Sequence, residues 1–166
     1  MEIDVRRLFE IEGEREDFSF SLDLSGTEIW GHKPLSSPVY IEGSAVNRSS
    51  IVTLAYKASC NLHTFCDRCL VEFDKPLSFS FEYTLVRELQ DSEIQEYILV
   101  EGDFFDLGAL CESDIVLNLP LKFLCRDDCK GLCPVCGNNL NHSECDCLNT
   151  QIDPRLAALK NLLKKD

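Results

Sequence analysis

The first half of the chain alternates between hydrophobic and polar positions with the two-residue period of β-strands. Residues 39–46 (VYIEGSAV) and 51–59 (IVTLAYKAS) are predicted strands, separated by a polar turn at residues 47–50. The second strand would bury Val52, Leu54, Tyr56 and Ala58 on one face. A third run alternates more clearly, and its buried face would comprise Leu77, Phe79, Phe81, Tyr83 and Leu85. Residues 60–70 (CNLHTFCDRCL) then lie at the end of a hairpin.

Two helices are predicted in the second half. Asp106 is a candidate N-cap, and Leu107, Leu110, Cys111, Asp114 and Ile115 follow at helical spacing, with Asp114 as the polar exception. Pro120 would end this helix, and Cys111 would pack as a small buried hydrophobe. Asp153 and Pro154 open the other helix, whose apolar positions are Leu156, Leu159, Leu162 and Leu163.

Shorter features complete the prediction. Residues 90–96 are polar and indicate a loop or a short helix, and residues 97–100 a further strand. The C-terminal helix is too short to be stable alone in water, so it must dock on the sheet or on a partner. We therefore expect an α+β fold with three parts: an antiparallel β-rich body with one or two helices (1–124), a cysteine-rich tail stapled by zinc (125–150) and a short helix (151–166).

Composition and charge restrict the function. The 166 residues, 45% of them hydrophobic, suffice for one domain with a core. The formal net charge of −13 argues against a broad electrostatic grip on nucleic-acid phosphates. The start (MEIDVRRLFE) has no apolar leader, and no later run approaches a membrane span, which predicts a cytoplasmic protein without membrane contact. In that reducing compartment, ten cysteines indicate metal more than disulfides.

Five of these cysteines lie in the tail within the stretch CKGLCPVCGNNLNHSECDC, residues 129–147. Its strongest unit is Cys133-Pro-Val-Cys136-Gly137, because a C-x-x-C turn supplies two ligands of a tetrahedral Zn²⁺ ion and glycine permits the positive φ that follows. Cys145 and Cys147 would complete that site. A second pair with the same spacing, Cys66 and Cys69, lies at the hairpin end.

One or two structural zinc ions are compatible with these spacings. Cys66 and Cys69 would join Cys125 and Cys129 in a second site only if the tail folds back onto the hairpin end, and spacing alone cannot assign this pairing. Eight cysteines would then be used, leaving Cys60 and Cys111.

Other chemistries fit the pattern less well. The spacing of Cys129, Cys133 and Cys136 matches an iron–sulfur triplet of radical enzymes, but only thirty residues follow. A redox C-x-x-C normally opens a helix, whereas a polar turn follows here. His63 and His142 are alternative ligands, although cysteines are plentiful. A catalytic zinc with an open position is not indicated, because the sequence has no H-E-x-x-H motif and no H-x-E motif upstream of the Pro134-Cys-x-x-Cys unit.

Several of these segments together resemble one family over nearly the whole chain. LHTFCDRCLVEF (62–73) is similar to the C-x-R-C-L hairpin of the YceD-like proteins, known as large ribosomal RNA accumulation proteins. The tail cysteines, the closing DPRLAAL (153–159), MEIDVRRL and the DLGALCESDIVLNLP helix also fit. The resemblance implies a bacterial or plastid factor needed for normal levels of the large-subunit 23S rRNA, with no established enzymatic activity. Some relatives lack most of these cysteines, which favours a structural metal.

The resemblance also implies which residues contact a partner: Arg68, Asp153, Pro154, Arg155, Leu156 and Leu159. Sixteen basic against twenty-nine acidic residues do not suit direct RNA binding. We therefore expect a ribosomal protein or a large-subunit precursor as the partner, with at most indirect rRNA contact and no small-molecule substrate. The competing hypothesis is a small metal-dependent or thiol-redox enzyme acting on RNA or protein thiols. Saturated four-ligand metal sites would favour the non-enzymatic factor.

Overall fold

The computed structural model describes residues 1–29, 31–88 and 97–149 of the chain. The chain divides into two compact units, which are described separately. The first comprises residues 1–64 and 74–121, and the second comprises residues 65–73 together with the chain from residue 122 onward. The second unit thus contains both the end of a hairpin and the cysteine-rich tail. The predicted C-terminal helix, with Asp153 to Leu159, and the segment 90–96 lie outside the described residues.

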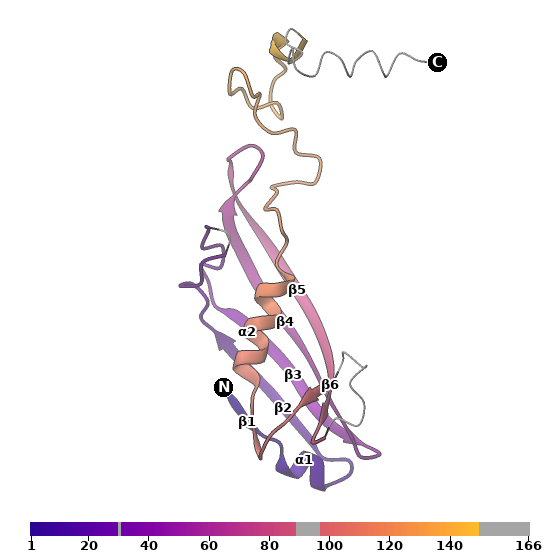
Figure 1. The fold of residues 1–166 in the computed structure, drawn as a ribbon. Helices are drawn as coiled ribbons and strands as arrows, with labels where there is room; N and C mark the ends of the chain where they lie inside the picture. Colours follow the sequence, from indigo (N-terminus) through magenta and orange to yellow (C-terminus); the bar gives the residue numbers. More distant parts are fainter. Residues whose placement is uncertain (30, 89–96, 150–166) are drawn as a thin grey trace, which may run out of the picture. The chain divides into compact units, whose positions relative to one another are not determined.

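A five-stranded sheet forms the body of the protein (Figure 1). Its strands, in spatial order, are β2 (Arg15–Leu22), β3 (Val39–Arg48), β4 (Ile51–Phe65), β5 (Glu72–Val86) and β6 (Tyr97–Leu99). The β2–β3 and β3–β4 pairs are antiparallel, whereas β6 is parallel to the last residues of β5. The expected α+β fold with a mostly antiparallel body is confirmed.

The first three predicted strands are present and longer than expected, and the strand predicted at residues 97–100 is β6. In β4 the positions Val52, Leu54, Tyr56 and Ala58 are all buried, as the alternation predicts. In β5 the apolar positions are consistently less exposed than the serines and Glu82 between them. The turn between β3 and β4 is tighter than predicted, because only residues 49 and 50 leave the ladder and both have positive φ. Such a two-residue turn matches the twist of the paired strands.

Helix α2 (Leu107–Asn118) lies over one face of this sheet (Figure 1). Its predicted N-cap is confirmed, since the backbone N–H of Ala109 donates to Asp106 Oδ1 at 3.0 Å. The polar exception on its buried face, Asp114, accepts hydrogen bonds from two strand tyrosines: Tyr83 Oη at 2.8 Å from Oδ1, and Tyr56 Oη on Oδ2. Both oxygens of this buried carboxylate thus accept hydrogen bonds, and these bonds hold the helix on the sheet.

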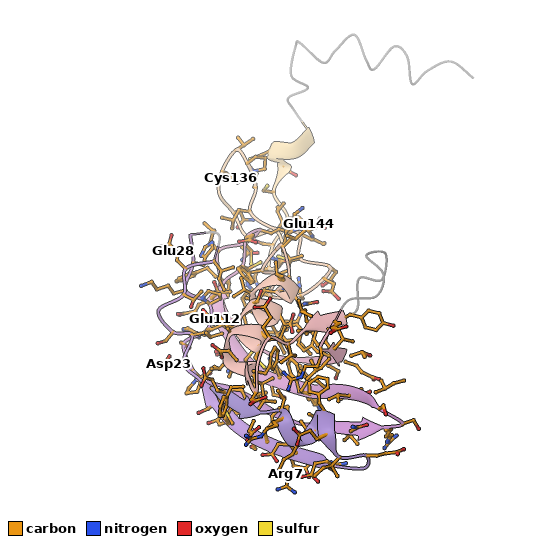
Figure 2. All side chains as sticks on the ribbon, turned by 60° about the horizontal axis from the view of Figure 1, so that its bottom comes forward. Arg7, Asp23, Glu28, Glu112, Cys136 and Glu144 are labelled. Carbon is orange, nitrogen blue, oxygen red and sulfur yellow. The ribbon has the colours of Figure 1, made fainter. Side chains whose placement is uncertain are left out.

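The N-terminal elements were not predicted as separate pieces. Strand β1 (Glu2–Asp4) pairs with β7 (Phe104–Asp106) in a second small sheet, and α1 (Arg6–Glu10) follows β1. These elements are only three to five residues long, so no periodicity is visible in them. Acidic side chains such as Asp23, Glu28 and Glu112 project from the first unit (Figure 2). Within the described residues, no helix has the length and apolar character needed to cross a membrane.

Candidate metal centres

Eight of the ten cysteines form two groups of four in the second unit, and each group can hold a metal ion. The first centre is defined as Cys66, Cys69, Cys125 and Cys129, and the second centre as Cys133, Cys136, Cys145 and Cys147. Within each group all four Sγ atoms lie within 4.8 Å of one another.

The spacing of the sulfurs fits a tetrahedral ion. In the first centre, Cys66 Sγ lies 3.8 Å from Cys129 Sγ, and Cys69 Sγ lies 3.7 Å from Cys125 Sγ. Four thiolates at about 2.3 Å from a zinc ion stand about 3.8 Å apart. A disulfide would need about 2.05 Å. The residues present therefore fit a thiolate-bound metal, and the four positions of a tetrahedron are filled by protein.

Two cysteines of the first centre, Cys66 and Cys69, lie in the turn between β4 and β5. The backbone N–H of Leu70 donates to the carbonyl of Cys66 at 2.9 Å, and Cys66 N–H donates to the carbonyl of Val71 at 2.9 Å. This turn brings both sulfurs of the C-x-x-C pair to one side. The prediction that Cys66 and Cys69 lie at a hairpin end is confirmed.

The tail is held against this turn by reciprocal hydrogen bonds. Asp67 N–H donates to the carbonyl of Phe123 at 2.8 Å, and Phe123 N–H donates back to Asp67 Oδ2 at 2.7 Å. On the other side, Arg68 Nη1 donates to the carbonyl of Cys129 at 2.8 Å, and Leu132 N–H donates to the carbonyl of Arg68 at 3.0 Å. The turn and the tail are therefore joined by hydrogen bonds of their backbone atoms, in addition to the close approach of their cysteine sulfurs.

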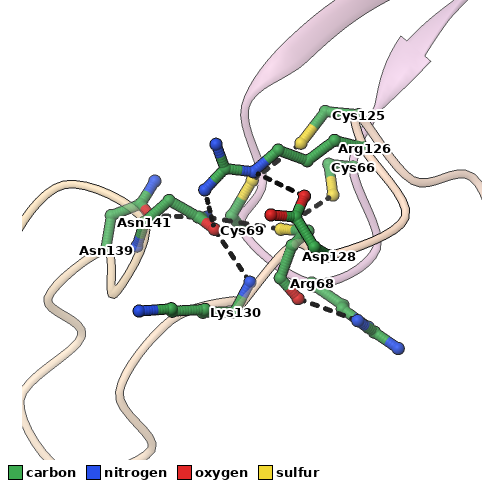
Figure 3. A network of polar contacts seen from close by, with 10 residues as sticks. Cys66, Arg68, Cys69, Cys125, Arg126, Asp128, Lys130, Asn139 and Asn141 are labelled. Carbon is green, nitrogen blue, oxygen red and sulfur yellow. Dashed lines mark hydrogen bonds and ion pairs between the residues drawn. The ribbon is translucent and has the colours of Figure 1, made fainter.

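A polar network surrounds the tail side of the first centre (Figure 3). Asn141 Nδ2 donates to Cys129 Sγ at 3.3 Å, and Asn141 Oδ1 accepts from Lys130 N–H and from Arg126 Nη2, each at 2.8 Å. Arg126 also pairs with Asp128 at 3.3 Å. An amide that donates to a ligand sulfur stabilises its thiolate form and fixes its orientation.

The second centre is built within the tail itself. Gly137 N–H donates to the carbonyl of Cys133 at 2.9 Å, and Gly137 has φ of +74°, as expected for glycine after the C-x-x-C pair. Cys133 N–H donates to the carbonyl of Asn138 at 2.8 Å, which closes the turn. Cys133 is buried, whereas Cys136 is exposed (Figure 2).

Each centre contains at least one cysteine whose pKa is lowered, which favours its thiolate form: Cys66 and Cys129 in the first centre and Cys133 in the second. Burial acts to raise the pKa of Cys66, but backbone N–H groups, led by that of Cys125, outweigh it and lower the pKa to about 6. The backbone N–H groups of Cys136 and Val135 lower the pKa of Cys133 to about 6. Cys125 and Cys145 retain their protons, because burial raises the pKa of Cys125 to about 12 and the hydrogen bond to Cys133 raises that of Cys145 to about 12. A first thiolate is thus available near neutral pH, and metal would displace the remaining protons.

The other predicted candidates lie elsewhere. Neither His63 nor His142 belongs to a four-cysteine group, and His63 Nδ1 lies 2.8 Å from Asp74 Oδ1. Cys60 and Cys111 are buried in the first unit, and burial raises the pKa of the Cys111 thiol to about 11. Arg68 is exposed and its guanidinium contacts a carbonyl rather than a sulfur.

Two residues that support the first centre without belonging to it were not predicted from the sequence. Asp67 and Asn141 hold the centre together through backbone atoms and a ligand sulfur. The only signal for Asn141 was its place in the polar run GNNLN, which predicted a turn. Asp67 lies inside the C-x-x-C pair, where an acidic side chain next to thiolates serves to accept a backbone N–H from the distant segment.

Comparison with known proteins identifies relatives over most of the chain. The model of the family described as "Large ribosomal RNA subunit accumulation protein YceD" matches residues 54–163. The uncharacterized protein YlbN of Bacillus subtilis strain 168 is 31% identical over 132 residues, which cover 78% of this chain and 77% of that protein.

Mycobacterial proteins are also similar. The uncharacterized proteins Mb2951c of Mycobacterium bovis and Rv2926c of Mycobacterium tuberculosis H37Rv are each 35% identical over 102 residues, covering 59% of this chain. The match spans about half, 49%, of the length of those two proteins. No solved structure matches the chain. The family match covers most of β4, the chain from there through α2, and both metal centres, so the chain belongs to the YceD family of large ribosomal RNA subunit accumulation proteins.

Proposed function

We propose that this protein is a non-enzymatic factor for the accumulation and assembly of the large-subunit 23S rRNA, and that it acts through a ribosomal protein or a pre-ribosomal particle. Zinc ions at the two centres would have a structural role. The family description supports the link to large-subunit rRNA. The geometry of the two centres supports the non-enzymatic, structural role.

The observation that carries this proposal is that protein thiols fill all four positions of each centre. A catalytic zinc keeps a position open for water or substrate, whereas structural zinc is closed by four protein ligands. The first centre also joins segments that lie 56 to 63 residues apart in the chain, which is a structural role. Bound metal would therefore act on the folding free energy of the second unit.

The charge favours a basic protein as the direct contact. The described part of the second unit has six carboxylates and four basic side chains: Asp67, Glu72, Asp127, Asp128, Glu144 and Asp146 against Arg68, Lys122, Arg126 and Lys130. Its net charge of −2 would become −6 with two zinc ions, because each ion bound by four thiolates contributes −2. Such a surface repels phosphates and attracts a cationic partner.

Binding measurements with purified components test this proposal. The zinc-loaded protein is titrated with isolated large-subunit precursor particles and, separately, with protein-free 23S rRNA, over a range of salt concentrations. We expect binding to the particles that weakens as salt rises, and much weaker binding to the naked RNA. Equal affinity for protein-free 23S rRNA would refute the preference for a protein contact.

Native mass spectrometry tests the structural role of the metal. We expect two zinc ions per chain, both coordinatively saturated, and removal of metal by a chelator should expose the second unit to protease while the sheet stays intact. An open three-cysteine site with a bound water would instead favour a metal-dependent enzyme.

A further inference from the structure

The two C-x-x-C turns share a backbone hydrogen bond and a positive φ, but one has leucine at the position where the other has glycine. In each, the fourth residue after the first cysteine donates its N–H to the carbonyl of that cysteine at 2.9 Å. In each, that residue has a positive φ: +74° at Gly137 and +58° at Leu70. Glycine adopts this conformation without cost, whereas a bulky side chain adopts it rarely and under strain.

Leu70 does not compensate for this strain by packing. Its side chain is 64% exposed, and two further large apolar residues on the same turn are also exposed, Phe65 at 51% and Val71 at 45%. A leucine side chain normally stabilises a fold by being buried, and the exposed side chain of Leu70 does not make this contribution. Strained positions of this kind persist where the side chain has a use beyond the fold.

We infer that the turn of the first centre, with its exposed apolar residues Phe65, Leu70 and Val71, is the surface that docks onto a basic protein of the large-subunit precursor. This inference rests on the function proposed above and names the contact surface. The two metal-facing cysteines and the hydrogen bonds to the tail hold the turn in one conformation, so the apolar side chains are presented without a large cost in conformational entropy on binding.

The charges around the turn select this occupant. Asp67 and Glu72 flank the apolar residues, and the first centre itself would carry a net charge of −2 with zinc bound. The one guanidinium of the turn, that of Arg68, donates to the carbonyl of Cys129. Exposed apolar side chains with acidic neighbours complement a partner whose apolar pocket has a basic rim, and this combination favours a basic protein over an RNA backbone.

A substitution that relieves the strain separates binding from stability. In Leu70→Gly the backbone conformation becomes favourable, so the two metal ions and the unfolding midpoint should be retained or the midpoint raised. Affinity for isolated large-subunit precursor particles should fall at least about tenfold, as for loss of a central apolar anchor. Leu70→Met, which keeps an apolar side chain, should restore most of the binding.

The second turn provides the matched control. Val135 is the exposed apolar residue of that turn, at 63% exposure, and Val135→Ser should bind the particles as the wild type does. A photoreactive benzophenone side chain at position 70 of the full-length protein should then crosslink to a basic ribosomal protein within the particle.

The outcomes separate this inference from the proposed function. Wild-type affinity in Leu70→Gly, a crosslink from position 70 to rRNA, or loss of metal in Leu70→Gly would each overturn the docking surface while the proposed function stands. Failure of the wild-type protein to bind the particles at all would remove the proposed function and this inference with it.

Discussion

Arg68 and Cys129 are separated by 61 positions in the chain, and the guanidinium of Arg68 donates a hydrogen bond to the carbonyl oxygen of Cys129 at 2.8 Å. The contact joins Arg68, which lies between Cys66 and Cys69, to a tail cysteine of the same centre (Figure 3). Arg68 thereby supports the first centre through the backbone of one of its cysteines, and the cysteine sulfurs stay available for a metal ion.

Arg68→Ala should weaken metal binding at the first centre only. One hydrogen bond of about 1 kcal/mol corresponds to roughly fivefold in affinity. Competition with a chromophoric chelator should show one of the two metal ions released more readily, by this factor. Arg48→Ala, at the exposed end of β3 in the first unit, is the control and should leave both affinities unchanged. Equal behaviour of the two variants would mean that this hydrogen bond does not support the centre.

Single cysteine substitutions should remove one metal ion each and loosen different segments. Cys66→Ser leaves three thiols in the first centre, so native mass spectrometry should find one zinc ion instead of two, and protease should cut at the hairpin end and near residue 125. Cys133→Ser should also retain one zinc ion but expose only residues 133–147. Cys60→Ala, outside both centres, should keep two. Unchanged metal content in Cys66→Ser would reduce the protein to a single centre.

Asp114→Ala should destabilise the first unit. The substitution leaves the hydroxyls of Tyr56 and Tyr83 without their acceptor, which we expect to cost about 2–4 kcal/mol of unfolding free energy. Glu112→Ala, on the exposed side of the same helix (Figure 2), should change stability by less than about 0.5 kcal/mol. Urea unfolding of the three proteins measures both effects, and a similar small effect of the two substitutions would contradict the role assigned to Asp114.

Stability should decline in alkaline solution because of the same cluster. Burial raises the pKa of Cys111 from 9.0 to about 11 and that of Tyr83 from 10.0 to about 12, and it also raises that of Tyr56. A group whose pKa is higher in the folded state stabilises the fold fully below its unfolded pKa and loses that contribution as pH rises through its folded pKa. The thermal midpoint should therefore be level up to about pH 9 and fall from there toward pH 12.

Tyr83→Phe should remove part of this decline, because the side chain can no longer ionise. Its midpoint should be lower than that of the wild type at pH 8 but should fall less steeply between pH 10 and 12. A parallel decline in both proteins would show that Tyr83 does not contribute to the alkaline transition.

The sequence by itself determined the local elements of the body. The alternation in residues 51–59 places the buried side chains of β4 correctly, because the two-residue period of a strand is a property of consecutive residues. In β5 the alternation identifies the less exposed face, but of the five side chains predicted to be buried only Leu85 is, and the other four are half-buried. The N-cap Asp106 is likewise a local signal. The three-residue strands β1 and β7 were missed, since their pairing joins residues a hundred positions apart and leaves no periodicity to detect.

Only the tertiary structure decided how the metal centres are assembled. C-x-x-C spacing identifies ligand pairs, but which pairs share an ion depends on chain reversal over dozens of residues, and several pairings satisfy the same spacing. The contacts of Asp67 with Phe123 and of Arg68 with Cys129 select one of them. The sequence also did not predict the positive φ of Leu70, because glycine indicates such a position and leucine does not. The geometry of the turn imposes that conformation, whichever residue occupies the position.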